Sequence, residues 1–171
     1  MKRPVQGPRT LVAGIGNIFL GDDGFGVETV RRLAGEPLPD HVEVVDIGVR
    51  GVHLAYQLLD GYDTVVLVDA TARGGAPGTL YVIDVGAVGG AGNGEPGAAP
   101  IDGHRMSPDA VLALLGTLSA GTGGTPPRRM LVVGCEPADV EEGIGLSPQV
   151  TAAVPEAVRL VADLVQHEAV R

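Results

Sequence analysis

Apolar runs of strand length alternate with segments of helical period along this chain, and no other feature of the sequence constrains the fold as strongly. Strands that alternate with helices are typical of a parallel sheet covered by helices on both faces. The strand-like runs are TLVAGIG (10–16), VEVVDIG (42–48), TVVLVDA (64–70), LYVIDV (80–85) and MLVVGC (130–135). We therefore expect an α/β protein with a mostly parallel β-sheet flanked by helices on both faces.

Four segments between or after these runs predict helices. After the first run, Val27, Val30 and Leu33 share one face, and a second stripe of Leu54, Leu58 and Leu59 follows the second run. The segments SPDAVLALLGTL (107–118) and SPQVTAAVPEAVRLVADLV (147–165) each open with a Ser N-cap and a Pro at the first helical position. Pro155 is expected to bend the last of these helices.

Length and composition indicate the class of protein. The 171 residues, 44% of them hydrophobic, suit one domain (1–171) with a core of Val, Leu, Ile and Ala, because aromatic residues make up only 3%. A net charge of −9 argues against nucleic acid as a partner. The first apolar run is too short for a membrane span or a signal peptide, and the single Cys135 cannot form an internal disulfide. We expect a soluble cytoplasmic protein without a membrane partner.

One segment departs from the alternating pattern. Residues 86–99 are rich in Gly and Ala and offer almost nothing to bury, so they cannot offset the entropy cost of ordering. We predict that they form a flexible surface loop within the domain.

Charged residues that follow strands form the candidate site. Asp22 and Asp23 come after the first strand, Asp69 ends the TVVLVDA strand, and His104 precedes the Ser107 helix. Because the carboxyl ends of parallel strands meet at one edge of a sheet, these side chains are expected to converge there. Two carboxylates and an imidazole form an open oxygen and nitrogen site for a divalent transition metal, with positions left for a substrate.

Each of these residues also has a purely structural interpretation. Asp22 is placed to cap the following helix, Asp69 could be held by a structural hydrogen bond, and a loop histidine such as His104 is usually solvated. Cys135 is most simply a small buried apolar residue. The GxG turn after the first strand also occurs in dinucleotide-binding domains, but the third glycine is missing and the aspartate pair would repel a pyrophosphate.

The motifs taken in order resemble those of the hydrogenase maturation endopeptidases. They are GIGNIFLGDDGFG, VVLVDA followed by APGTL, a histidine before SPDAVLALL, and VGCEP with GIGLSPQV, and they extend from Leu11 to about Val161. The resemblance implies an α/β fold with a twisted, largely parallel sheet. It also implies an endopeptidase that removes the C-terminal extension of a nickel–iron hydrogenase large-subunit precursor after nickel insertion.

The same resemblance assigns roles to the site residues. It implies that Asp23, Asp69 and His104 bind nickel, most simply the nickel of the precursor, and that Asp23 and Asp69 are the catalytic residues of an aspartic-type endopeptidase. Whether the metal activates water or a carboxylate acts as general base stays open at this point. Asp22 is then expected to cap the helix while Asp23 faces the metal.

Two departures from the family pattern stand out. The first ligand is commonly glutamate in the family and is the shorter Asp23 here. The usual Asp-Gly-Gly motif after the second strand reads DIGVRG (46–51), with Arg50 as an added charge.

Two other classes of function remain as alternatives. A non-catalytic chaperone for the large subunit would not need the ligands, and a nucleotide-binding domain would use the GxG turn.

Overall fold

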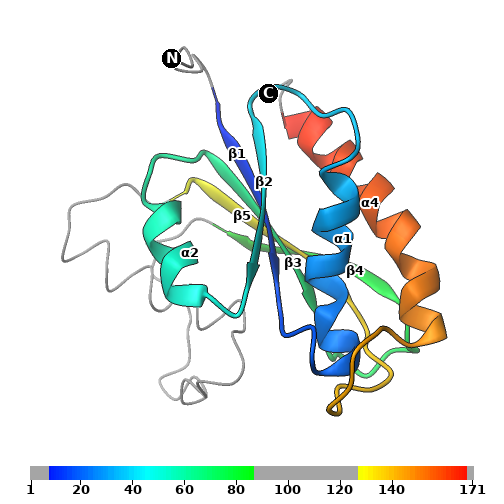
Figure 1. Cartoon of the computed structure of the whole chain (residues 1–171). Helices are drawn as coiled ribbons and strands as arrows, with labels where there is room; N and C mark the ends of the chain where they lie inside the picture. The colour runs from blue at the N-terminus through cyan, green and yellow to red at the C-terminus, as the bar shows by residue number, and fades with distance from the viewer. Residues whose placement is uncertain (1–7, 87–126, 169–171) are drawn as a thin grey trace.

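The centre of the protein is a five-stranded sheet with the strand order β2-β1-β3-β5-β4 (Figure 1). The computed structural model describes residues 8–86 and 127–168. The strands are β1 (Thr10–Ile15), β2 (Val42–Gly48), β3 (Thr64–Ala70), β4 (Leu80–Gly86) and β5 (Arg129–Cys135). All five coincide, within a residue at either end, with the strand-like runs of the sequence.

The sheet is parallel except at one edge. β1 pairs in parallel with β2 and β3, and β3 pairs in parallel with β5, whereas β4 is antiparallel to β5. β1 and β3, which precede Asp23 and carry Asp69, are therefore direct neighbours. The prediction of a mostly parallel sheet is confirmed.

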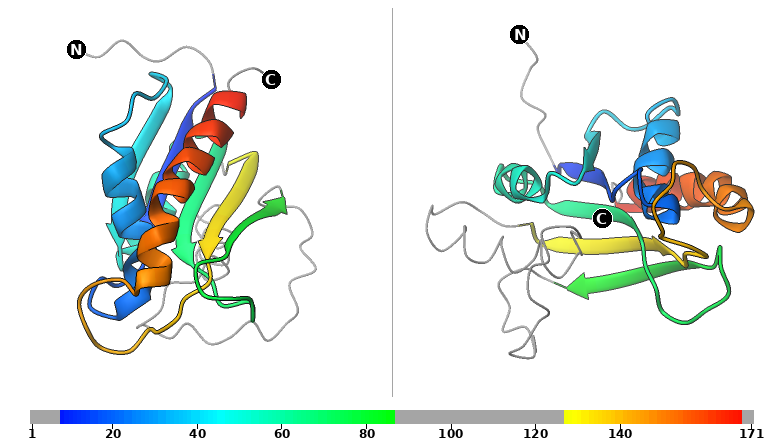
Figure 2. Two further views of the ribbon diagram at one scale, coloured as in Figure 1. Left: turned by 90° about the vertical axis from the view of Figure 1, so that its right-hand side faces the viewer. Right: turned by 60° about the horizontal axis from the view of Figure 1, so that its bottom comes forward.

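Helices cover both faces of this sheet. α1 (Phe25–Leu33) and α4 (Pro148–Glu168) lie side by side on one face, and α2 (Gly51–Leu58) lies on the other (Figures 1 and 2). Val66 and Val68 of β3 point into the core on the α1/α4 side, and Val65 and Leu67 point into the core on the α2 side. β3 is thus buried on both faces, as its unbroken apolar sequence indicates.

The first helix packs very closely against the sheet. Its predicted apolar face is buried, with Val27, Val30 and Leu33 no more than 1% exposed. A Cβ atom at Gly26 would overlap the carbonyl oxygens of Val68 and Ile15, so only glycine permits this approach. The close contact fixes the turn before α1 above the ends of β1 and β3.

The last helix begins where the sequence predicts. Ser147 caps it, since its hydroxyl oxygen accepts the backbone N–H of Val150 at 3.4 Å, and the helix continues through Pro155. Among the helices described, none combines the length and the apolar character that crossing a membrane demands. Both the predicted 107–118 helix and, apart from Gly86, the predicted 86–99 loop lie outside the described residues.

Candidate active site

Two predicted site residues meet at the glycine that ends the first strand. Gly16 has a φ of +131°, a conformation that favours glycine, and its amide N–H bonds the carbonyl of Gly48 at 2.9 Å. A Cβ atom here would overlap the carbonyl oxygen of Asp23 and would lie 3.6 Å from Oδ1 of Asp69. The Asp23 backbone and the Asp69 carboxylate therefore both lie against the same side of Gly16, at the carboxyl edge of β1 and β3.

Asp23 lies in the 3-10 turn η1 (Gly21–Gly24), directly before α1. Its side chain is partly exposed, and Oδ2 accepts the backbone N–H of Asn17 at 2.8 Å. No hydrogen bond from the described residues reaches Oδ1. One oxygen thus fixes the side chain across the turn, while the other keeps its acceptor capacity for a metal or a proton.

Asp69 is the second-to-last residue of β3 and is only 5% exposed. Thr71 follows it closely, and the Thr71 hydroxyl donates to the Asp69 carbonyl at 3.4 Å. A carboxylate buried to this degree requires polar partners or a bound cation. The position at the strand end agrees with the sequence analysis, although the side chain is more enclosed than an exposed strand end suggests.

The third predicted ligand, His104, lies outside the described residues. Within the described ranges, no three His, Cys, Asp or Glu side chains form a group that could hold a metal ion. Of the three predicted ligands, only Asp23 and Asp69 lie among the described residues, and the ligand set stays a prediction.

Asp22 does not cap α1, so that prediction is wrong. The N-cap of α1 is Gly24, without a side-chain hydrogen bond. Asp22 is 1% exposed and instead accepts four hydrogen bonds from residues before α4. The donors are the backbone N–H groups of Ala138 (2.8 Å), Asp139 (3.1 Å) and Ser147 (2.7 Å) and the Ser147 hydroxyl (2.8 Å). Asp22 therefore ties the turn after β1 to the loop after β5 and to the start of α4.

The buried Asp22 carboxylate stays ionised because of these donors. Burial raises the pKa of Asp22, but the hydrogen bonds from Ser147, Ala138 and Asp139 outweigh burial, and the net shift is downward.

The pKa of the neighbouring Cys135 thiol is shifted upward. Burial, together with the charges of Asp22 and Glu136, raises it to about 12. Cys135 is therefore a neutral, fully buried thiol, as predicted, and not a nucleophile.

A third buried carboxylate, Glu136, was not predicted from the sequence. It follows β5 directly, is 4% exposed, and its Oε1 accepts the N–H groups of Arg73 and Gly75, both at 2.8 Å, and the Tyr81 hydroxyl at 2.9 Å. The backbone donors, Arg73 first, lower the pKa of Glu136. Its sequence signal is the one that marked Asp69, namely a carboxylate at the end of a buried strand.

The unusual DIGVRG motif forms a compact end to β2. Ile47 is 1% exposed and packs in the core on the α2 side, and Gly48 has a φ of +59°. The Arg50 guanidinium folds back and donates to the carbonyls of Asp46 (2.7 Å) and Ile47 (3.2 Å). Arg50 therefore stabilises the strand end, and its charge is held by backbone oxygens.

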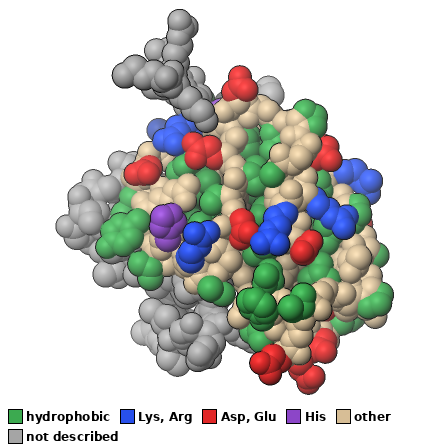
Figure 3. Space-filling view, viewed as in Figure 1, with side chains coloured by type: hydrophobic (Ala, Val, Ile, Leu, Met, Phe, Trp, Pro, Cys, Tyr) green, Lys and Arg blue, Asp and Glu red, His purple; other side chains and the backbone are tan. Residues whose placement is uncertain are grey.

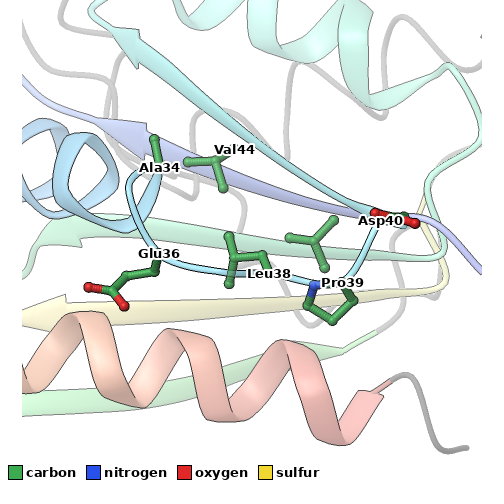
Figure 4. Close-up of a pocket in the computed structure, with 7 residues that line it drawn as sticks. Ala34, Glu36, Leu38, Pro39, Asp40 and Val44 are labelled. Carbon is green, nitrogen blue, oxygen red and sulfur yellow. The ribbon is translucent and has the colours of Figure 1, made fainter.

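A hollow of about 410 Å³ lies away from this edge, where β2 begins (Figure 4). It is lined by residues of the loop from α1 to β2, among them Leu38 and Pro39, and by Val42 and Val44. Because β1 and β2 run parallel, this hollow is at the opposite end of the sheet from Asp23 and Asp69. It is not part of the candidate site.

Comparison with known proteins confirms the resemblance seen in the sequence. The model of the hydrogenase maturation protease family matches residues 27–164. The hydrogenase expression/formation protein HupD of Rhizobium leguminosarum bv. viciae is 33% identical over 157 residues, covering 91% of this chain and 73% of HupD. The hydrogenase 2 maturation protease of Escherichia coli (strain K12) is 32% identical over 156 residues, covering 90% of this chain and 88% of that protein.

Solved structures show the same fold. The hydrogenase maturating endopeptidase HybD from E. coli superposes with a TM-score of 0.71 at 29% identity, covering 94% of this chain and 93% of HybD. A hydrogenase 2 maturation peptidase from a Thaumarchaeota archaeon superposes with a TM-score of 0.68 at 32% identity, covering 92% and 97%. Since the family model spans most of the chain and these relatives match nearly its whole length, the chain belongs to the hydrogenase maturation protease family and is a peptidase.

Proposed function

We propose that this protein removes the C-terminal extension of a nickel–iron hydrogenase large-subunit precursor, and that it does so after nickel has been inserted. The observation that carries the proposal is that the Asp23 backbone and the Asp69 carboxylate both lie against Gly16, in a chain whose relatives are hydrogenase maturation proteases.

In this proposal nickel arrives with the substrate. Asp23, Asp69 and His104 are its ligands on the enzyme, and the precursor supplies the others. The chemistry of the donors fits, because carboxylate oxygen and imidazole nitrogen both bind divalent transition metals. Oδ1 of Asp23 has no hydrogen bond within the described residues, so it keeps a lone pair for this purpose. The shorter Asp23, compared with the usual Glu, is therefore compatible with a ligand role.

Asp23 and Asp69 are also the proposed catalytic residues of an aspartic-type reaction. A carboxylate beside the scissile peptide can accept a proton from water as water attacks the carbonyl, and can return it to the leaving amine. Asp69, buried and next to Gly16, is the better enclosed of the two. Substrate-bound nickel would polarise the carbonyl if it lies close enough, as metal ions do in other hydrolases.

The test mixes purified enzyme with the large-subunit precursor in nickel-loaded and nickel-free forms and follows the mass of the large subunit. The proposal predicts a single cut near the C-terminus in the nickel-loaded form only. Equal cleavage of both forms would contradict the requirement for nickel. Stable binding of the loaded precursor without cleavage would favour a chaperone, and tight binding of a nucleotide without processing would favour the nucleotide-binding alternative.

A further inference from the structure

A row of positions leads along the carboxyl edge from Asp69 toward β4. Asp69 pairs with Gly134 of β5, and Gly134 pairs with Tyr81 of β4. Paired residues on adjacent strands direct their side chains to the same face of the sheet, here the face covered by α2. Gly134 has no side chain, and a Cβ atom there would meet the side chain of Thr71. The loop after β3 therefore passes directly over Gly134 of β5, toward Tyr81 of β4.

This loop holds Arg73 in a defined position. The backbone N–H of Arg73 donates to Glu136 Oε1 at 2.8 Å, and the Tyr81 hydroxyl donates to the same oxygen at 2.9 Å. The Arg73 guanidinium lies 5.7 Å from the centre of the Tyr81 ring, within range of a cation–π contact. Its backbone and its side chain are therefore both oriented before any ligand binds.

The charge of Arg73 is unusual for its surroundings. The loops at the carboxyl edge carry Asp22, Asp23 and Glu136, and acidic side chains also gather at the lower end of the molecule in the view of Figure 3, where the starts of α1 and α4 lie. None of the ion pairs formed within the described residues involves Arg73. Two other cations at this edge are already engaged: Arg50 donates to backbone carbonyls, and Arg31 pairs with Asp46 at 3.2 Å.

We propose that Arg73 determines substrate specificity by binding an acidic side chain of the precursor close to the scissile bond. This inference rests on the proposed function, with Asp69 at the reacting centre. Two strand spacings separate Asp69 from Tyr81, about 9.5 Å, and an extended peptide advances about 3.3 Å per residue. The acidic residue is therefore expected about three positions from the cleaved peptide. Arg73, which forms no ion pair within the described residues, then sets the register of the peptide.

The test measures kcat and KM for processing of the nickel-loaded precursor. Arg73→Ala should lower kcat/KM about tenfold, mainly through KM, because a charge-assisted hydrogen bond to the substrate is lost in both the ground state and the transition state. Arg73→Glu should lower it further. Arg159→Ala, which removes an exposed cation from α4, is the matched control and should leave both constants unchanged.

Substitutions in the precursor provide the second arm. Each acidic residue within about four positions of the cut is replaced by Ala and by Lys. One Ala substitution should reproduce the loss seen with Arg73→Ala, and the Lys substitution at that position should restore cleavage by Arg73→Glu. Arg73 variants that process the precursor like the control would overturn the inference, as would a loss with Arg73→Ala that no precursor substitution reproduces. If wild-type enzyme cleaves no precursor, the proposed function itself fails.

Discussion

Carboxylates at the two ends of the sheet are stabilised by different kinds of partner. At the amino end, Arg9 pairs with Glu43 at 3.0 Å and lies 4.4 Å from the centre of the Tyr62 ring, and the Tyr62 hydroxyl bonds Glu43 at 2.6 Å. At the carboxyl end, the buried carboxylates of Asp22 and Glu136 accept hydrogen bonds from uncharged donors. An ion pair neutralises Glu43 at the amino end, whereas Asp22 and Glu136 at the carboxyl end keep their charge while they hold the loops in place.

This difference shows how a site can be rigid and still able to bind a cation. Backbone N–H groups stabilise a carboxylate without neutralising it by a counterion. Asp22 holds the turn that contains Asp23, and Glu136 holds the loop that follows Asp69. The negative charge that favours a cation is thereby kept beside Asp23 and Asp69, the proposed metal ligands.

The largest expected effect is the loss of processing when a proposed ligand at the carboxyl end is changed. Asp69→Asn and His104→Ala should each reduce cleavage of the nickel-loaded precursor by at least about 100-fold, since weakening even the support of a metal ligand costs 10- to 100-fold. Asp40→Asn, an exposed carboxylate at the opposite end of the sheet, is the control. Processing by Asp69→Asn at the rate of this control would refute the role of Asp69.

The next effect concerns stability. Asp22→Ala leaves the N–H groups of Ala138, Asp139 and Ser147 without their acceptor, so we expect a loss of about 3 kcal/mol in the free energy of unfolding. In a chain of this size that loss lowers Tm by about 6–12 °C. Glu142→Ala, an exposed acid in the same loop, should change little. Thermal unfolding measures both, and equal Tm values would contradict the anchoring role of Asp22.

These results also show what the sequence could and could not predict. The strands were predictable because the apolar runs are local and long enough to identify, and TVVLVDA is buried on both faces as expected. The role of Asp22 was not, because its donors are 116 to 125 residues away, and a local rule assigned it to the helix that follows. Glu136 depends in the same way on the distant Arg73 loop. The position of these carboxylates at the carboxyl edge of the sheet was predictable from the sequence, but their hydrogen-bond partners were not.

A smaller effect is expected from pH. The pKa values of Asp22 and Glu136 are both lowered by folding from ordinary values of 3.8 and 4.5. Their contribution to stability is complete above those values and is lost as the pH falls through the lower folded-state pKa values. The free energy of unfolding should therefore decline below about pH 4. Urea unfolding between about pH 2.5 and 6 measures the decline, which Asp22→Asn should make shallower. An unchanged slope in that variant would contradict the assignment.

The smallest effect is expected at the amino end. Glu43→Gln removes the ion pair between Glu43, whose side chain is 51% exposed, and Arg9, whose side chain is 32% exposed. Because the pair is exposed, its loss should lower the free energy of unfolding by no more than about 1 kcal/mol. Added salt should shrink the difference from wild type, because an exposed pair is screened. If Glu43→Gln lowered the free energy of unfolding as much as Asp22→Ala does, and independently of salt, the Glu43 pair would be no weaker than the Asp22 anchor. That result would contradict the difference proposed between the two ends of the sheet.

Asp23 offers the most direct test, because it adjoins Asp22 but keeps one carboxylate oxygen without a hydrogen bond within the described residues. The measurement compares Asp23→Asn with wild type in two assays, cleavage of the nickel-loaded precursor and thermal unfolding. We predict that the variant loses cleavage while its Tm stays close to that of wild type. Full cleavage by a folded Asp23→Asn enzyme would contradict the claim that this edge of the sheet is the active site.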